Sequence, residues 1–196
     1  MLRRLAILSA CAIVLALFSP SAAHAESRTL VDGRGDVWAM DSPELGQNTQ
    51  VPQRRQNDIL RTVFAHHDRS VIVRTKFAEL DRVGQMWLMA IKLRTNTGQV
   101  RRIALWAGPD QFTHRWRGSL IRANGAPMTC ASHRIDYVAN VVQVRIPRSC
   151  LGDPRWVQAS MAAGTVAPDG VFFADNPVNE GPSVRIPSLT TRIFRG

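Results

Sequence analysis

The stretch that decides the fold runs from Asn57 to Leu80, with the sequence NDILRTVFAHHDRSVIVRTKFAEL. Val71, Val73 and Phe77 share one side of a two-residue period, which is the pattern of a half-buried strand. The segment before this run is rich in β-branched and aromatic residues, and residues 67–70 supply a polar turn between the two. We therefore expect a β-hairpin at the centre of the fold.

The rest of the chain also has the pattern of short strands separated by turns. Turn signals recur about every 8 to 12 residues, and no segment has a convincing helical period. Asn96-Thr97-Gly98 separates two β-prone runs, residues 112–116 and 119–122 read as a short pair of strands, and residues 147–152 suit one helical turn. The sequence predicts an all-β fold, a single antiparallel β-sandwich or jelly-roll of about nine to eleven strands with one disulfide.

The N-terminus has the pattern of a cleaved signal peptide covering residues 1–25. Arg3 and Arg4 form a basic start, residues 5–18 are apolar, and Ala23-His24-Ala25 is a small-residue cleavage site. The apolar run has about 14 residues, whereas a membrane span needs roughly 20. We expect cleavage, secretion to the extracellular space, and no membrane span afterwards.

The mature chain, residues 26–196, is of a size that suits one domain with its own core. Residues 41–57 are polar and contain Pro43 and Pro52, which predicts a surface loop. From about residue 176 the chain is rich in Pro, Ser and Arg, which predicts a tail lying on the surface.

The chain is strongly basic, with a formal net charge of +10. This falls to +8 in the mature protein, because Arg3 and Arg4 leave with the signal peptide and no acid does. The arginines are spread along the chain, and a secreted protein rarely meets nucleic acid. We expect no nucleic-acid partner, and attraction to an anionic envelope polymer is the more plausible consequence of the charge.

The mature chain keeps two cysteines, Cys130 and Cys150, which in an oxidising compartment predict one disulfide. Residues 134–138 and 141–146 read as a hairpin turning at Ala139-Asn140, and this register puts the two cysteines within one residue of facing each other. The bond would close a loop of about 21 residues and stabilise by roughly 3 kcal/mol. The alternative is a metal-binding or catalytic thiol.

Asp32, Asp36 and Asp58 are candidate metal ligands. Carboxylates on loops at strand ends bind Ca²⁺, which takes oxygen ligands. The alternative is turn chemistry, because Asp next to Gly is common in tight turns. The pair Asp175-Asn176 could add ligands, although the sequence does not require it. Calcium is the one cofactor that the sequence suggests.

Trp116 lies in the polar segment His114-Arg115-Trp116-Arg117. An exposed tryptophan can stack on a sugar ring while neighbouring guanidinium groups donate hydrogen bonds or meet acidic groups. The alternative is a tryptophan that covers the edge of the sandwich. These four residues are the candidate ligand-binding site.

His66, His67 and Asp68 form the candidate acid–base cluster. Adjacent histidines on a strand point to opposite faces, so they do not easily share one metal. A solvated hairpin end is the competing interpretation. The chain has no Gly-x-Ser-x-Gly elbow, no His-Glu-x-x-His and no phosphate loop, so we predict a protein without catalytic residues.

Several short motifs carry a resemblance. They are Asp32-x-x-Gly35-Asp36, Asp58-Ile59 with Val63 and His66, Val71-x-Val73 ending at Leu80, and the run from Ile146 to Val157. On these the chain resembles a group of small secreted actinobacterial proteins of unknown function. More distantly it is similar to family 9 carbohydrate-binding and DOMON-type β-sandwiches, which bind sugars or haem. The axial Met and His of the haem-binding members have no match here.

Together these observations predict a secreted, monomeric, non-catalytic binding module, whose ligand is a carbohydrate or cell-envelope polymer. One alternative is a small secreted hydrolase using the region of His66, His67 and Asp68. Another is a structural or interaction protein of the cell envelope without a small ligand.

Overall fold

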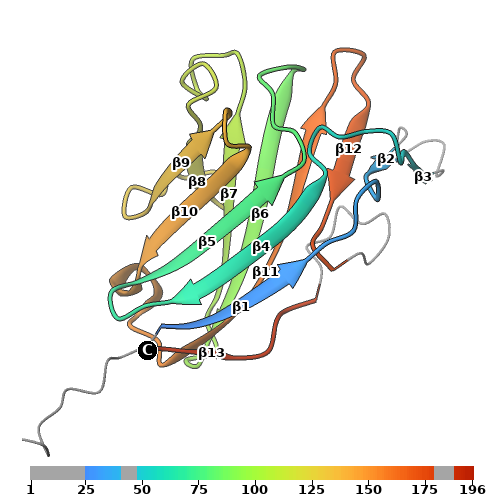
Figure 1. Ribbon diagram of the computed structural model, residues 1–196. Coiled ribbons are helices and arrows are strands. Elements are labelled where there is room, and N and C mark those ends of the chain that lie inside the picture. The colour runs from blue at the N-terminus through green and yellow to red at the C-terminus, as the bar shows by residue number, and fades with distance from the viewer. Residues whose placement is uncertain (1–24, 41–47, 179–187) are drawn as a thin grey trace, which may run out of the picture.

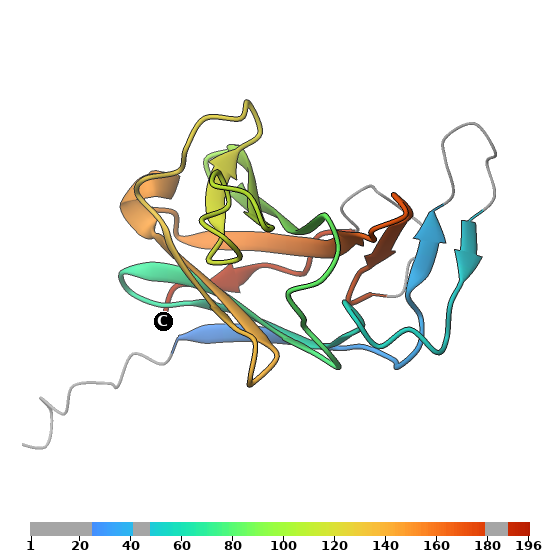
Figure 2. The same ribbon diagram turned by 90° about the horizontal axis from the view of Figure 1, so that it is seen from above.

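A computed structural model describes residues 25–40, 48–178 and 188–196 of the chain. Two antiparallel sheets pack face to face, as Figures 1 and 2 show. The first sheet contains, in spatial order, β1 (Glu26–Val31), β4 (Ile59–His66), β5 (Ser70–Phe77), β10 (Val141–Pro147) and β9 (Ser132–Asp136). The prediction of an antiparallel β-sandwich is confirmed.

The second sheet is larger and lies behind the first in Figure 1. Its strands, in spatial order, are β3 (Asn48–Gln50), β2 (Trp38–Met40), β12 (Phe172–Asp175), β11 (Trp156–Val166), β6 (Met86–Thr95), β7 (Val100–Ala107) and β8 (Ser119–Arg122). A last strand, β13 (Ile193–Phe194), pairs with the start of β11. The described residues thus form 13 strands instead of nine to eleven, because three of them are only two or three residues long.

The central hairpin forms as predicted. β4 and β5 pair antiparallel, with Val63 opposite Arg74, and a polar turn joins them after His66. Val71, Val73 and Phe77 are fully buried while Arg74 and Lys76 are exposed, so the two-residue period of the sequence is realised as one core face and one solvent face.

The core lies between the two sheets and is built from alternate residues of each long strand. β11, the longest strand, differs, because residues 159–165 are buried on both faces of the strand. The largest fully buried apolar side chains are Phe64, Phe77, Trp87, Ile59, Leu80, Met89, Ile91, Leu93, Leu105, Ile146, Leu151 and Met161. Each contributes roughly 1.5–3 kcal/mol by leaving water, which is the main force that holds the layers together.

The disulfide Cys130–Cys150 is present, but the register that predicted it was wrong by two residues. Val141 faces Asp136, not Val138. The reason is a wider turn, in which the Asp136 carboxylate accepts a hydrogen bond from the Ala139 amide at 2.9 Å. Cys150 therefore lies beyond the ladder, in the 3₁₀ turn Arg148–Leu151 that the sequence predicted as helical.

The prediction of a strand over residues 112–116 was also wrong. His114, Arg115 and Trp116 have positive φ angles of 51°, 52° and 70°, which no strand accommodates. Asp110 closes the turn, because its carboxylate accepts hydrogen bonds from both the amide and the hydroxyl of Thr113 at 2.7 Å. Residues 119–122 do form the predicted strand, β8, which pairs with β7.

The predicted loop and tail both contribute to the second sheet. Residues 48–50, in the middle of the 41–57 segment, form β3, and within the tail Ile193 of β13 is fully buried. The signal peptide lies almost entirely outside the described residues, as do positions 41–47 of the loop and 179–187 of the tail. In the described residues, no helix reaches the length and apolarity needed to cross a bilayer.

Candidate metal centre

The candidate metal centre lies where β1 crosses over to the second sheet. Asp32 follows the last residue of β1, and a tight turn at Gly33–Gly35 brings the chain back to Asp36, just before β2. Gly35 has φ +77°, and a Cβ there would come within 2.6 Å of the Pro52 carbonyl oxygen. The turn therefore requires glycine at this position.

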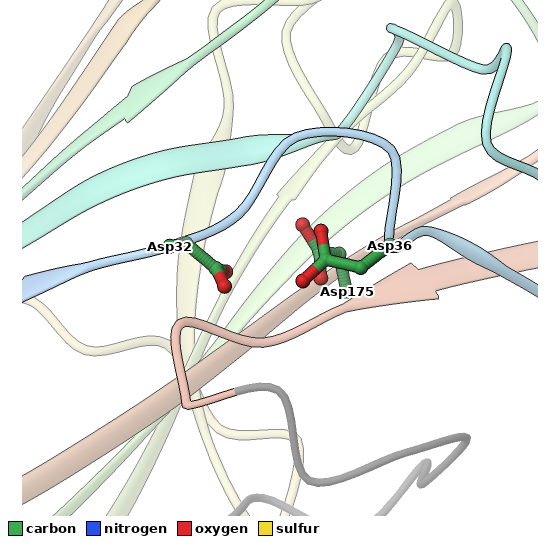
Figure 3. Close-up of side chains that lie close together, drawn as sticks. All are labelled: Asp32, Asp36 and Asp175. Atoms are coloured by element: carbon green, nitrogen blue, oxygen red, sulfur yellow. The ribbon is translucent and has the colours of Figure 1, made fainter.

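Asp32, Asp36 and Asp175 converge on one point, as Figure 3 shows. Each offers one carboxylate oxygen, and these three oxygens lie within 4.8 Å of one another. Asp175 ends β12 of the second sheet, so the cluster joins residues that are far apart in sequence. Its position is held by the amides of Ile59 and Asn176, which donate to its two oxygens at 2.6 and 2.7 Å.

Asp36 is the least satisfied member of the cluster. Its residue is 4% exposed, and neither carboxylate oxygen accepts a hydrogen bond from an amide or from a hydroxyl side chain among the described residues. The one side-chain donor in reach is the carboxyl of Asp32, and only when Asp32 is protonated. One oxygen of Asp32 is also buried without a partner, while its other oxygen accepts the Gly33 amide at 3.0 Å. Burying a polar group without a partner costs about 1–3 kcal/mol, and more for a charge. A bound cation would supply the missing partner.

The electrostatics of the cluster point the same way. Burial, followed by the charges of Asp175 and Asp36, raises the pKa of Asp32 to about 8. Burial also raises the pKa of Asp175 to about 8, although the hydrogen bond from the Ile59 amide opposes this shift. Burial raises the pKa of Asp36 as well. Three carboxylates this close cannot all stay ionised at neutral pH unless a positive charge is added.

Asp58 lies beside the cluster and supports it. It is 2% exposed, one oxygen accepts the Gly35 amide at 3.3 Å, and the other is buried without a partner in the described chain. Burial raises the pKa of Asp58, and the charge of Asp36 adds to this. Its neighbour Asn57 accepts a hydrogen bond from the Trp87 indole at 3.0 Å, which anchors this corner to the core.

The residue types fit a hard cation. The cluster offers carboxylate oxygens and no sulfur or imidazole, which favours Ca²⁺ or Mg²⁺ over zinc or copper. Ca²⁺ accepts irregular sets of loop ligands, whereas Mg²⁺ demands a near-octahedral arrangement and keeps its waters. Ligands drawn from one turn and one strand end suit Ca²⁺ better.

The structure thus brings together two of the three aspartates that the sequence singled out, and replaces Asp58 with Asp175 as the third converging residue. From the sequence, Asp175 was only a possible additional ligand. Its role depends on the pairing of β12 with β2 and β11, for which the local sequence carries no signal.

The candidate ligand-binding residues around Trp116 are less well placed. The Trp116 side chain is half-buried against the core, so only part of its ring is open to a ligand. Its backbone carbonyl accepts a hydrogen bond from the Tyr137 hydroxyl at 2.7 Å, which holds the turn in place. Arg115 and Arg117 are exposed. Of the four residues, His114 alone lines the adjacent pocket of about 430 Å³, together with Phe112 and His133.

The candidate acid–base cluster is not assembled. His66 is fully buried, with Nδ1 3.1 Å from the Ile193 carbonyl oxygen, and burial lowers its pKa. His67 and Asp68 are exposed in the turn, where Asp68 lies 3.8 Å from Arg195. The imidazole of His66 and the carboxylate of Asp68 therefore lie in different environments, one in the core and one in solvent.

Comparison of this chain with protein-family models, with curated proteins and with solved structures gave no match. The resemblance to small secreted actinobacterial proteins, and the more distant one to family 9 carbohydrate-binding and DOMON-type sandwiches, therefore stays a prediction.

Proposed function

We propose that this protein is a secreted, non-catalytic binding module whose sandwich is completed by a bound calcium ion. The observation that carries the metal is Asp36, a carboxylate that is 4% exposed, has no amide or hydroxyl donor among the described residues, and faces two further aspartates. A divalent cation neutralises this charge and is held by Asp32, Asp36 and Asp175, with Asp58 close by.

The binding role is supported by the fold and by the chemistry that the chain lacks. The sequence carries no catalytic motif, and the His66–Asp68 cluster, on which a hydrolase would depend, is divided between the core and the solvent. Antiparallel sandwiches present broad sheet faces and end loops on which ligands bind. A carbohydrate or envelope polymer remains the proposed ligand class.

The metal is tested with the chain purified from the medium of a secreting host and freed of cations with EDTA. Calcium titration followed by calorimetry should show binding. At calcium 100 times the dissociation constant, the unfolding free energy should rise by about 2.7 kcal/mol, which in a domain of this size corresponds to roughly 5–10 °C in Tm.

Asp36→Asn should abolish both the binding heat and the rise in Tm, because it removes the buried charge that the cation neutralises. In EDTA at about pH 8 this variant should be at least as stable as the parent, since a neutral amide replaces an unpaired carboxylate. Asp68→Asn, at an exposed turn, is the matched control and should bind calcium normally. Unchanged calcium binding in Asp36→Asn would exclude the assigned site.

A further inference from the structure

The outer face of the first sheet carries an unusual distribution of charge. On β4 and β5, every second side chain points away from the core. The register places Arg61 directly opposite Lys76, and Arg74 lies two residues before Lys76 on β5. On the next strand, β10, Arg145 also points outward. We call these four exposed cations, Arg61, Arg74, Lys76 and Arg145, the basic sheet face; the sheet that carries it faces the viewer in Figure 1.

These cations have no acidic partner in the described structure. The ion pairs there involve Glu26, Glu79, Asp136 and Asp68, and none of them reaches the basic sheet face. Asp136 is the one acid among the described strand residues of the same outer face, and it pairs with Arg134 at 3.0 Å. Asp68, in the β4–β5 turn, lines a pocket with Arg145 but forms its ion pair with Arg195. Lys76 donates to the Ala139 carbonyl at 2.6 Å, which holds its ammonium group in place without neutralising it.

The arrangement costs stability in the free protein. Like charges directly opposite on neighbouring strands repel each other, and residues two apart on one strand lie about 7 Å apart on the same side. Arg61 and Lys76 are such an opposed pair. A sheet face that keeps this repulsion is suited to a ligand that brings negative charge to it at a similar spacing.

The face also has a shape for a ligand. A groove of about 290 Å³ runs between Arg61, Arg74 and Lys76, floored by Val63 and Val141. Around it, the register places hydroxyl and amide side chains such as Thr29 and Gln143 in the same row as Arg74. These groups can hydrogen-bond sugar hydroxyls while the cations meet the charges.

We infer that the basic sheet face binds an anionic polysaccharide, in which carboxylate or phosphodiester groups repeat along a sugar or polyol chain. The described outer face has no aromatic side chain, so it lacks the stacking platform that single-stranded nucleic acid uses. Among the apolar residues on this face, Val63, Ile72 and Val141 are half-buried, and Val31 at the end of β1 is 77% exposed. One exposed valine offers little to insert into a lipid surface. The inference rests on the proposed binding role but not on the metal centre.

The test measures binding of the secreted chain to polygalacturonate, as the carboxylate probe, and to poly(glycerol phosphate), as the phosphodiester probe. Dextran is the neutral control. We expect binding to at least one polyanion, weakened as salt is raised because exposed charge pairs are screened, and none to dextran. Binding to neither polyanion, or equal binding to dextran, would overturn the inference. The preferred polyanion identifies which anionic group is recognised.

Two triple variants with the same change in net charge assign the surface. Arg61→Gln/Arg74→Gln/Lys76→Gln removes three cations from the basic sheet face, and Arg101→Gln/Arg102→Gln/Arg122→Gln removes three exposed ones from β7 and β8. The first should weaken binding about tenfold or more and the second less than about twofold. An equal loss in both would mean that net charge alone acts, and would overturn the assignment.

Further arms separate this inference from other partners and from the metal. Tighter binding to single-stranded DNA, or to phosphatidylglycerol vesicles, than to either polysaccharide would also overturn it. The first triple variant should keep its Tm, since it relieves the repulsion between Arg61 and Lys76. The first triple variant should bind calcium as the parent does, so failure of the metal centre and failure of the basic sheet face are distinguishable.

Discussion

At the scale of single residues, the site is defined by buried carboxylates whose partners are incomplete. Asp36 was identifiable from the sequence because Asp beside Gly marks a turn between strands. Its burial was not, because the side chains that cover it come from other parts of the chain. Trp116 shows the reverse case, since its polar neighbourhood in sequence suggested an exposed ring, whereas the fold packs the ring partly against the core, as in the alternative of a tryptophan that covers the sandwich edge.

The raised pKa values lead to a prediction about pH. In the unfolded chain Asp32 and Asp175 titrate near 3.8, whereas without a cation both have a pKa of about 8 in the fold. The folded apoprotein therefore holds more protons, and its stability from these groups is complete below about pH 3.8 and is lost as pH rises through about 8. Calcium replaces those protons, so the stability that calcium adds should grow from about pH 5.5 to about pH 9.

This is measured as the difference between urea unfolding free energies with calcium and with EDTA across that pH range. His66 has the opposite sign, because its lowered pKa costs stability as pH falls below about 6.5. It affects both samples alike and cancels in the difference. An increment that is flat or that falls with rising pH would contradict the assignment of Asp32 and Asp175 to the metal.

At the scale of elements, the long strands were predictable and the short connections were not. β4 to β7 follow from alternation and turn residues that are local in sequence. The turn at 108–118 and the wide turn before β10 depend on single side-chain contacts from Asp110 and Asp136, which override strand propensity. The disulfide was found nonetheless, because two cysteines allow only one pairing.

The C-terminal strand β13 lies in the segment that the sequence predicted to be a surface tail, and its packing can be tested. Ile193 of β13 is fully buried against the core, while its neighbour Phe194 is 49% exposed. Ile193→Ala should lower the unfolding free energy by about 2–5 kcal/mol, and Phe194→Ala by less than about 1 kcal/mol. Chemical denaturation of both variants is the measurement. Similar small effects would mean that β13 is not part of the folded core.

At the scale of the whole molecule, the metal centre connects the two layers. The crossover from β1 to β2 carries Asp32 and Asp36, and β12 of the second sheet carries Asp175. Asp175 also accepts the amide of Ile59, the first residue of β4 in the opposite sheet. A cation bound here would neutralise charge at the point where both sheets and their crossover meet.

Calcium should therefore slow amide hydrogen exchange in both sheets at once. We expect added protection at the amides of Ile59 and Asn176, which donate to Asp175, as well as in the turn at residues 33–36. Exchange measured by mass spectrometry or NMR, with calcium and with EDTA, provides the comparison. The distant β6–β7 turn at residues 96–98 is the internal control. Protection limited to the 33–36 turn would show that the ion orders only the loop.

The sequence by itself determined the long strands, the turn aspartates Asp32 and Asp36, and the disulfide partners, because each depends on spacing that is local or on a pairing without alternatives. The tertiary structure alone decided that Asp175 joins those aspartates, and that Arg61 faces Lys76 on an outer sheet surface. Ile59 and Asp175 are 116 positions apart, yet a hydrogen bond joins them. Such contacts arise from the packing of two sheets and the register of each, which are set by the burial of the whole core and not by any one segment.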